Sequence, residues 1–458
     1  MSGRTGKPGM SPEEKSALLA SLRGSAAPPR RKPAAPARPG GDYAHLTDFT
    51  SLPNYQRLQM QHDVSEMLQV ANPFFQAHDG CPADTSSMDG VELINFASYN
   101  YLGLNGHPEV VEAAAKAMAL YGTSASASRV VGGDRPIHHE LEAELADFYG
   151  AEDALVFVSG YSTNVATICE LMGPKDLILH DALMHNSAIM GAEYSGAARR
   201  AFAHNDPDAL EDILLQCRGD YQRVLILIEG LYSMDGDIPD LARFTQIKQR
   251  HDAWLMVDEA HGLGVLGRTG RGLAEHCGLD PTLVDIWMGT MSKTLAGCGG
   301  FIAGQGALID LLKYNASGFV YSVGLAPPLA AASLAALRIL LREPERVARL
   351  QENGALFRKL ANEAGLDTGS SAGMAVVPVI VGDSMRAVKL VERLRMRGFC
   401  ALPILYPAVP EKTARLRFFI SSTHSPEQLA AAVAATAEEL KALEEAGFGV
   451  SSALSAMS

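Results

Sequence analysis

The stretch WLMVDEAHGLGVLGRTGRG, residues 254–272, together with DIWMGTMSKTLAGCGGFIAG, residues 285–304, decides the fold of this chain. Each half contains a short apolar run, WLMV in the first and IWM in the second, which is typical of a buried strand. The first run ends at Asp258 and the second leads to Lys293. Because ligands bind at the carboxyl ends of strands in open α/β sheets, we expect a binding site at this edge.

The residue types in this stretch allow one specific chemistry. A lysine such as Lys293, placed between Ser292 and Thr294 and followed by glycines, can form a Schiff base with pyridoxal 5'-phosphate (PLP). An aspartate on the neighbouring strand can keep the pyridine nitrogen protonated, which makes the ring an electron sink. The alternative is a surface lysine beside two solvated acids, which the length of the motif disfavours.

The string VDEAHGLGVLG, followed by GRG and a single Ser-Lys-Thr step, resembles the α-oxoamine synthases, a family of fold type I PLP enzymes. The resemblance extends over residues 92–447. It implies that Lys293 carries the cofactor and acts as general base, that Asp258 holds the pyridine nitrogen, and that His261 tunes the phenolic oxygen. It also implies an α/β fold with a mainly parallel central sheet and a small α+β carboxyl-terminal domain.

Composition narrows the class of protein. The 458 residues are 47% hydrophobic and carry a formal net charge of −13, which indicates a globular protein and argues against nucleic-acid binding. The six cysteines have no metal-binding spacing, so we expect no metal site and a reduced, cytoplasmic protein. The most apolar stretch, 325–341, opens with two prolines and predicts a buried helix, so we expect no membrane span.

Composition and pattern divide the chain into five segments. We expect a tethered helix with a Pro/Ala/Arg linker over 1–41, an amino-terminal arm over 42–92, a PLP-binding domain over 93–335, a small domain over 336–447 and a loose tail over 448–458.

Residues 11–24, SPEEKSALLASLRG, predict an isolated amphipathic helix with one leucine face. A short helix on a tether cannot bury these leucines alone, which favours docking to a partner protein. The sequence resembles the helical starts of assembly-line modules, so an acyl carrier protein is the expected partner. A frayed terminus is an equally weighted alternative.

The cofactor phosphate has an expected cradle. The apolar run ALVFV ends at Ser159-Gly160-Tyr161, where glycine lets a helix start close to an anion. This turn resembles the SGYxAN phosphate-binding turn of the family. Thr290 and Ser292 complete the expected cofactor-binding set.

Two further strand ends supply candidates. His185, in a D-x-L-x-H-x-S pattern, matches the histidine that stacks on the PLP ring in the family, although a lone histidine is more often a satisfied core residue. The run VLILI leads to Glu229 and then to Ser233, which is expected near the phenolic oxygen. We expect Asp235 and Asp237 to order this loop rather than act in chemistry.

Three residues are candidates for substrate binding. Arg417 matches the arginine that binds the substrate carboxylate, for which a planar guanidinium is well suited. Arg415 fits an edge-strand arginine in water. Tyr99 resembles the serine palmitoyltransferase branch of the family, whereas most other branches have Asn at this position. Arg129 is expected in a thioester-facing role or, preferably, a structural role.

The resemblance implies decarboxylative condensation of a small amino acid with an acyl thioester, on CoA or a carrier protein, giving an α-amino ketone. The alternatives are a PLP aminotransferase and a carrier-protein-docked regulatory subunit. The segment YSVGLAPPL, residues 321–329, resembles one that crosses a dimer interface in the family, so we expect a homodimer with shared active sites. The sequence leaves open which amino acid (Gly, Ala or Ser) and which acyl length are used.

Overall fold

The computed structural model describes residues 44–67, 70–406, 408–410 and 412–449, so the helix expected at 11–24 lies outside the described residues. The chain divides into two units, residues 1–63 and 64–458. The described part of the first unit has two short 3-10 helices, η1 (Ala44–Thr47) and η2 (Phe49–Ser51), and the start of α2 (Pro53–Met67).

The second unit contains a seven-stranded sheet in the order β3-β9-β8-β7-β6-β4-β5. β9 runs antiparallel to both of its neighbours and the other strands are parallel, so the prediction of a mainly parallel sheet is confirmed. The strands are β3 (Asp153–Phe157), β4 (Leu177–Asp181), β5 (Ala198–Phe202), β6 (Val224–Glu229), β7 (Trp254–Asp258), β8 (Ile286–Thr290) and β9 (Gly300–Gly304).

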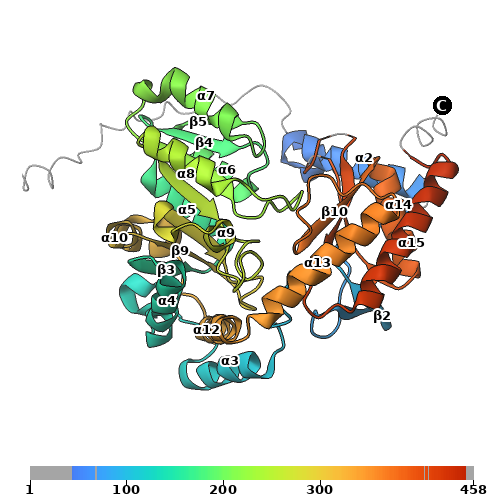
Figure 1. Ribbon diagram of the computed structural model, residues 1–458, viewed down its shortest axis with the longest axis horizontal. Coiled ribbons are helices and arrows are strands. Elements are labelled where there is room, and N and C mark those ends of the chain that lie inside the picture. The colour runs from blue at the N-terminus through green and yellow to red at the C-terminus, as the bar shows by residue number, and fades with distance from the viewer. Residues whose placement is uncertain (1–43, 68–69, 407, 411, 450–458) are drawn as a thin grey trace, which may run out of the picture. The chain divides into compact units, whose positions relative to one another are not determined.

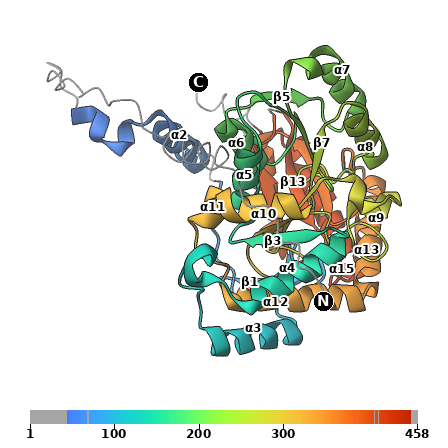
Figure 2. The ribbon, with the colours of Figure 1, turned by 90° about the vertical axis from the view of Figure 1, so that its left-hand side faces the viewer.

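The central strands β6, β7 and β8 are largely apolar runs because both faces of the sheet are covered there, whereas β5 at the edge carries exposed arginines. In β6, Val224 and Ile226 point into one core, whereas Leu225 and Leu227 point into the other. Figure 2 shows α5, α6, α10 and α11 on the second of these faces. That layer comprises α5 (Gly160–Leu171), α6 (Asn186–Ser195), α10 (Gly306–Asn315) and α11 (Ser317–Val320). The opposite layer includes α4 (Pro136–Tyr149), α7 (Pro207–Cys217), α8 (Leu241–Arg250) and α9 (Leu273–Cys277), with α12 (Pro327–Arg342) and α3 (Pro108–Tyr121) packed beyond α4.

Two three-stranded sheets complete this unit. The first, in the order β10-β13-β12, packs against α14, and α14 and α13 contact α15 (Figure 1). The second joins β1 and β2, which precede the seven-stranded sheet in the chain, to β11, which follows it. The elements are β1 (Thr85–Met88), β2 (Val91–Asn95), α13 (Glu345–Glu363), β10 (Val376–Gly382), α14 (Ser384–Met396), β11 (Phe399–Cys400), β12 (Leu402–Ile404), β13 (Ala414–Phe419) and α15 (Pro426–Glu445).

The apolar stretch at 325–341 forms α12, which begins at Pro327 and buries most of its small and leucine side chains. Among the residues that the structure describes, no helix has the length and apolar character needed to cross a bilayer.

Candidate active site

A cavity of about 370 Å³ lies at the carboxyl ends of the parallel strands. β7 and β8 are parallel neighbours, with Asp258 opposite Met288, so the loops that follow them meet at one edge of the sheet. The cavity brings together every predicted site residue except Arg129. Those that line it are Tyr99, Ser159, Gly160, Tyr161, His185, Ser233, Asp258, His261, Thr290, Ser292, Lys293 and Arg417.

Lys293 extends into this cavity from the turn after β8. Its ammonium nitrogen lies 5.4 Å from the centre of the Tyr99 ring. Removal from water lowers the pKa of Lys293 to about 8, although the nearby carboxylates of Asp258 and Glu229 act in the opposite direction. A substantial fraction of the amine is therefore neutral near physiological pH and can act as nucleophile or base.

Asp258 is buried at the end of β7 and is held by two donors. The backbone N–H of Ala260 donates to Oδ1 over 2.9 Å, and Asn164 Nδ2 donates to Oδ2 over 2.9 Å. Asn164 also donates to Ser187 Oγ over 2.9 Å, so it links β7 to the start of α6. We did not predict Asn164 as a site residue, yet its signal was present as the last position of the SGYxAN turn.

The first turn of α5 packs directly on the sheet. A Cβ on Gly160 would lie 2.9 Å from Thr290 Oγ1, and a Cβ on Gly300 would lie 2.7 Å from the Cα of Gly160. Both positions therefore need glycine. Ser159 precedes this turn without capping it through its side chain, which leaves N–H groups of α5 facing the cavity with the hydroxyls of Thr290 and Ser292. This is an anion-binding arrangement.

Two histidines stand on the cavity wall. His185 is the N-cap residue of α6, and its Nδ1 lies 2.7 Å from Ser187 Oγ, which fixes the ring. His261 is buried, and its Nδ1 lies 2.7 Å from the hydroxyl of Tyr101. Burial, and then the charge of Lys293, lower the pKa of His261 well below its usual value, so this ring is neutral.

Glu229 is a second buried carboxyl group in the cavity, beside Asp258. Burial and the charge of Asp258 raise the pKa of Glu229 to about 8. Its Oε2 accepts a hydrogen bond from the backbone N–H of Ser233 over 2.9 Å, which shapes the loop after β6. Glu229 is not among the site residues that the sequence predicts, although its place at the end of an apolar run is a signal for one.

Arg417 reaches the cavity from β13. Nη1 donates to the carbonyl oxygen of Ser233 over 2.8 Å, and the guanidinium lies 4.6 Å from the centre of the Phe419 ring. Nε is buried without a hydrogen-bond partner, and no carboxylate in the described part of the chain forms an ion pair with Arg417. The guanidinium is therefore positioned to receive an external carboxylate.

The prediction for Arg415 was wrong. β13 is the central strand of its sheet, between β10 and β12, so it has no free edge. Arg415 is only 6% exposed and forms an ion pair with Asp235. A buried arginine keeps its charge only when a partner compensates for the lost water, which is the role of Asp235 here.

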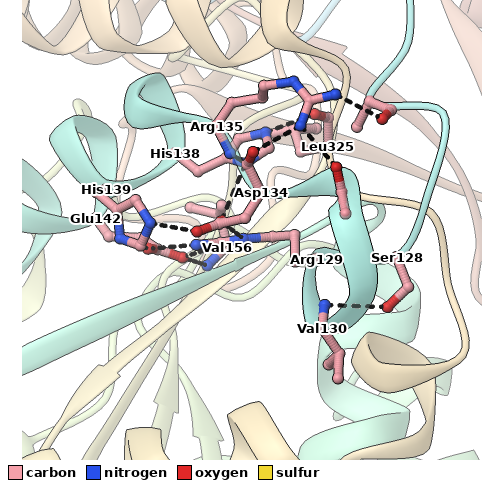
Figure 3. A network of polar contacts seen from close by, with 12 residues as sticks. Ser128, Arg129, Val130, Asp134, Arg135, His138, His139, Glu142, Val156 and Leu325 are labelled. Carbon is pink, nitrogen blue, oxygen red and sulfur yellow. Dashed lines mark hydrogen bonds and ion pairs between the residues drawn. The ribbon is translucent and has the colours of Figure 1, made fainter.

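Arg129 lies outside the cavity in a buried ion network (Figure 3). Its Nη2 donates to Glu142 Oε2 over 3.0 Å and its Nε to Asp134 Oδ1 over 2.6 Å. Glu142 also accepts the backbone N–H of Val156 over 2.9 Å, which connects α4 to β3. These contacts favour the structural role and leave no contact between Arg129 and the cavity.

The cavity fits PLP. Its lining includes the anion-binding first turn of α5, the buried Asp258 carboxylate at the end of β7 and the Lys293 amine. Buried polar atoms that lack partners, among them Asn164 Oδ1 and Arg417 Nε, await a polar ligand. The fold and the site together define a PLP-dependent transferase of fold type I.

Comparison with known proteins agrees. Residues 91–435 match the family model for aminotransferase class I and II. The chain is 41% identical, over 77% of its own length and 90% of the relative, to an 8-amino-7-oxononanoate synthase of Symbiobacterium thermophilum. It is 37% identical, over 74% of its length and 51% of the relative, to 4-hydroxy-2,2'-bipyrrole-5-methanol synthase of a Serratia species.

A solved serine palmitoyltransferase of Sphingomonas wittichii superposes with a TM-score of 0.82 at 29% identity, covering 86% of this chain and 98% of that one. The chain belongs to the aminotransferase class I and II family and, within it, to the α-oxoamine synthases. Enzymes of this kind are PLP-dependent acyltransferases that join an amino acid to an acyl thioester with loss of CO2.

Proposed function

We propose that this chain condenses a small amino acid with an acyl thioester and releases CO2, a free thiol and an α-amino ketone. The observation that carries the proposal is one cavity that holds Lys293, Asp258 and Arg417 together. A base, a cofactor-charge partner and a carboxylate receptor are the three groups that this reaction needs from the protein.

Each group has a defined part. Arg417 receives the carboxylate of the amino acid with two donors of its planar guanidinium. Lys293, with a pKa of about 8, takes the proton from the α-carbon. When bound, PLP supplies the electron sink that delocalises the negative charge on that carbon. Asp258 would keep the ring nitrogen of bound PLP charged, His185 would pack against the ring, and Ser233 and His261 would tune its phenolic oxygen; all four residues line the cavity.

Two alternatives predict different products. An aminotransferase would use the same Lys293 and Asp258 without releasing CO2, whereas a silent regulatory subunit would lack the lysine that is present here. The experiment is to supply glycine, alanine or serine with acyl-CoA or acyl-carrier-protein donors and to measure CO2 and free thiol. Transfer of the amino group to a keto acid, without CO2 or thiol, would exclude the condensation.

The acyl donor is a separate question. We propose delivery from an acyl carrier protein that docks through residues 11–24, because that leucine-faced sequence resembles the helical starts of assembly-line modules. Deleting residues 1–41 is expected to raise the KM for the carrier-bound donor and to leave the KM for the CoA donor unchanged. Equal use of the carrier-bound donor by the truncated enzyme would contradict docking.

A homodimer with shared active sites is part of the proposal. Val131 and Tyr321 are 79% and 87% exposed beside a hollow of about 460 Å³, and exposed apolar groups of this kind favour an interface. Light scattering of wild type and Tyr321→Glu tests it, since a buried charge would weaken the dimer.

All six cysteines are free, in keeping with a cytoplasmic location.

A further inference from the structure

Three neighbouring strands of the central sheet, in the order β6-β4-β5, end at the same edge. The loop after β4 leads to His185, and the loop after β6 carries Ser233, so both border the cavity. The loop after β5 carries His204, which does not line the cavity. β4 lies between the other two strands. A group on the β5 loop that reaches across the end of β4 can therefore contact both the loop after β4 and the loop after β6.

His204 makes those contacts. Its Nδ1 lies 2.8 Å from Asp181 Oδ1, at the end of β4, and its Nε2 lies 3.1 Å from Asp237 Oδ2, in the loop after β6. Among the described residues, neither carboxylate forms an ion pair with a lysine or an arginine. His204 is therefore the cation that both of these aspartates share.

Hydrogen bonds around the two aspartates make the cluster rigid. Asp181 is fully buried, and its Oδ2 accepts the hydroxyl of Tyr232 over 2.8 Å and the N–H of Asn205 over 2.7 Å. Asn205 Nδ2 donates to Asp237 Oδ2 over 2.8 Å from a left-handed backbone with φ of +52°. The imidazole packs edge-on against the Tyr232 ring, with centroids 4.5 Å apart.

The charge on His204 is stable. Burial disfavours it, but the hydrogen bond to Asp181 and the ion pair with Asp237 outweigh burial and raise the pKa of His204 to about 10. The imidazolium therefore persists through the neutral range and compensates two carboxylates that would otherwise repel each other.

Short covalent paths connect this cluster to the cavity. Asp181 Oδ1 accepts the N–H of Leu183 over 2.7 Å, which shapes the turn into the N-cap residue His185. Tyr232 directly precedes Ser233, whose carbonyl oxygen receives Arg417. A change in the spacing of the two aspartates would therefore displace groups on both sides of the cofactor.

We infer that His204 is a positioning residue for the PLP site, acting through Asp181 and Asp237 to fix the loops that carry His185 and Ser233. This inference rests on the cofactor assignment in the proposed function. It predicts that loss of the imidazolium weakens cofactor binding without any direct contact to the cofactor.

The test uses full-length His204→Gln, with Tyr232→Phe as a milder second variant that removes one hydrogen bond to Asp181. His251→Gln is the matched control: this histidine is also partly buried beside a carboxylate, Glu211, but it precedes β7 and so lies at the opposite edge of the sheet. The readouts are the PLP dissociation constant from absorbance titration and the Tm of the cofactor-free protein.

We expect the PLP dissociation constant to rise about ten-fold in His204→Gln and less in Tyr232→Phe. A change of about ten-fold is typical when a residue that orients a ligand-binding side chain is lost, as known for side chains that orient metal ligands. His251→Gln should retain wild-type PLP affinity. Lower Tm in the cofactor-free variants with unchanged PLP affinity would overturn the inference. If His204→Gln does not fold, unchanged affinity in Tyr232→Phe overturns it.

Wild-type PLP binding is measured first, so that a failure of the cofactor assignment is separated from a failure of the role of His204. If the wild type binds PLP and the variants bind it with the same affinity, the result contradicts the role of His204 but not the cofactor assignment.

Discussion

Arg417 Nη1 donates a hydrogen bond to the carbonyl oxygen of Ser233 over 2.8 Å, which joins β13 of the carboxyl-terminal part to the loop after β6. Arg417, which we propose receives the substrate carboxylate, is thereby held against the loop that carries Ser233. The proposed substrate and cofactor residues are therefore connected by a direct hydrogen bond.

Replacing Arg417 is expected to affect binding of the amino acid most. Arg417→Lys keeps the charge but loses the planar pair of donors, so the KM for the amino acid should rise about 10- to 100-fold, the equivalent of a charged hydrogen bond of about 1.5–3 kcal/mol. Arg415→Lys is the matched control, because Arg415 pairs with Asp235 outside the cavity. A similar KM effect in both variants would argue against the carboxylate role of Arg417.

Lys293→Ala should abolish turnover and the visible absorbance of covalently bound cofactor near neutral pH. The side chain is the cavity's only lysine among the described lining residues, so no other amine can replace it. Turnover and absorbance of purified protein reconstituted with PLP measure both effects. Wild-type turnover by the variant would refute the assignment of Lys293.

The pKa of Lys293 predicts how fast PLP loads. Only the neutral amine attacks the aldehyde, and burial lowers this pKa from 10.5 to about 8. The loading rate of cofactor-free protein should therefore fall about ten-fold for each pH unit below 8 and level off above it. Stopped-flow absorbance from pH 6 to 10 measures this profile.

Glu229→Gln provides a check on that profile. The Glu229 carboxylate raises the pKa of Lys293, so its removal should move the break in the profile to lower pH. A break near the value for free lysine, in either protein, would contradict the effect of burial.

Asp258→Asn should lower kcat by at least about 100-fold, because the ring nitrogen loses the charge that keeps it protonated. Asn164→Ala removes the hydrogen bonds to Asp258 Oδ2 and Ser187 Oγ but leaves the Asp258 carboxylate in place, so a smaller loss, about ten-fold, is expected from it. Steady-state kinetics with saturating PLP measure both. Equal losses in the two variants would mean that Asp258 acts mainly through its contact with Asn164.

Replacing Arg129 is expected to lower the stability of the protein without changing its KM for the amino acid. Arg129→Gln leaves the buried Glu142 without its cation, and the free energy of unfolding should fall by about 3–5 kcal/mol. Where the variant stays folded, its KM for the amino acid should match that of wild type. Denaturant unfolding and kinetics on the same preparation test this. A raised KM with unchanged stability would restore Arg129 to the substrate-binding set.

Several elements could be predicted from the sequence for simple reasons. β6 and β7 are buried on both faces, so their sequences are continuous apolar runs with no polar interruption. The lysine and aspartate of the site stand where two such runs end, and strand ends that share a sheet edge share a cavity. The sequence motif around Lys293 also predicted that the cofactor is PLP.

Other features depended on which strands are neighbours. The sequence predicts that Arg415 lies on an edge strand in water, whereas pairing of β13 with both β10 and β12 buries it. The role inferred for His204 depends on β4 lying between β5 and β6, which no local pattern reveals. The hydrogen bond from Asn164 to Asp258 likewise joins α5 to the end of β7, two elements far apart in the sequence.

The sequence by itself determined the strands, the class of enzyme and the chemical groups at positions 293, 258 and 417, because residue type and local period are properties of the chain alone. The tertiary structure decided which buried charges share partners: Arg129 with Glu142, Arg415 with Asp235, and His204 with two aspartates. The physical reason is that the pairing of a buried charge depends on distance in space, and strand order sets that distance between residues far apart in the chain.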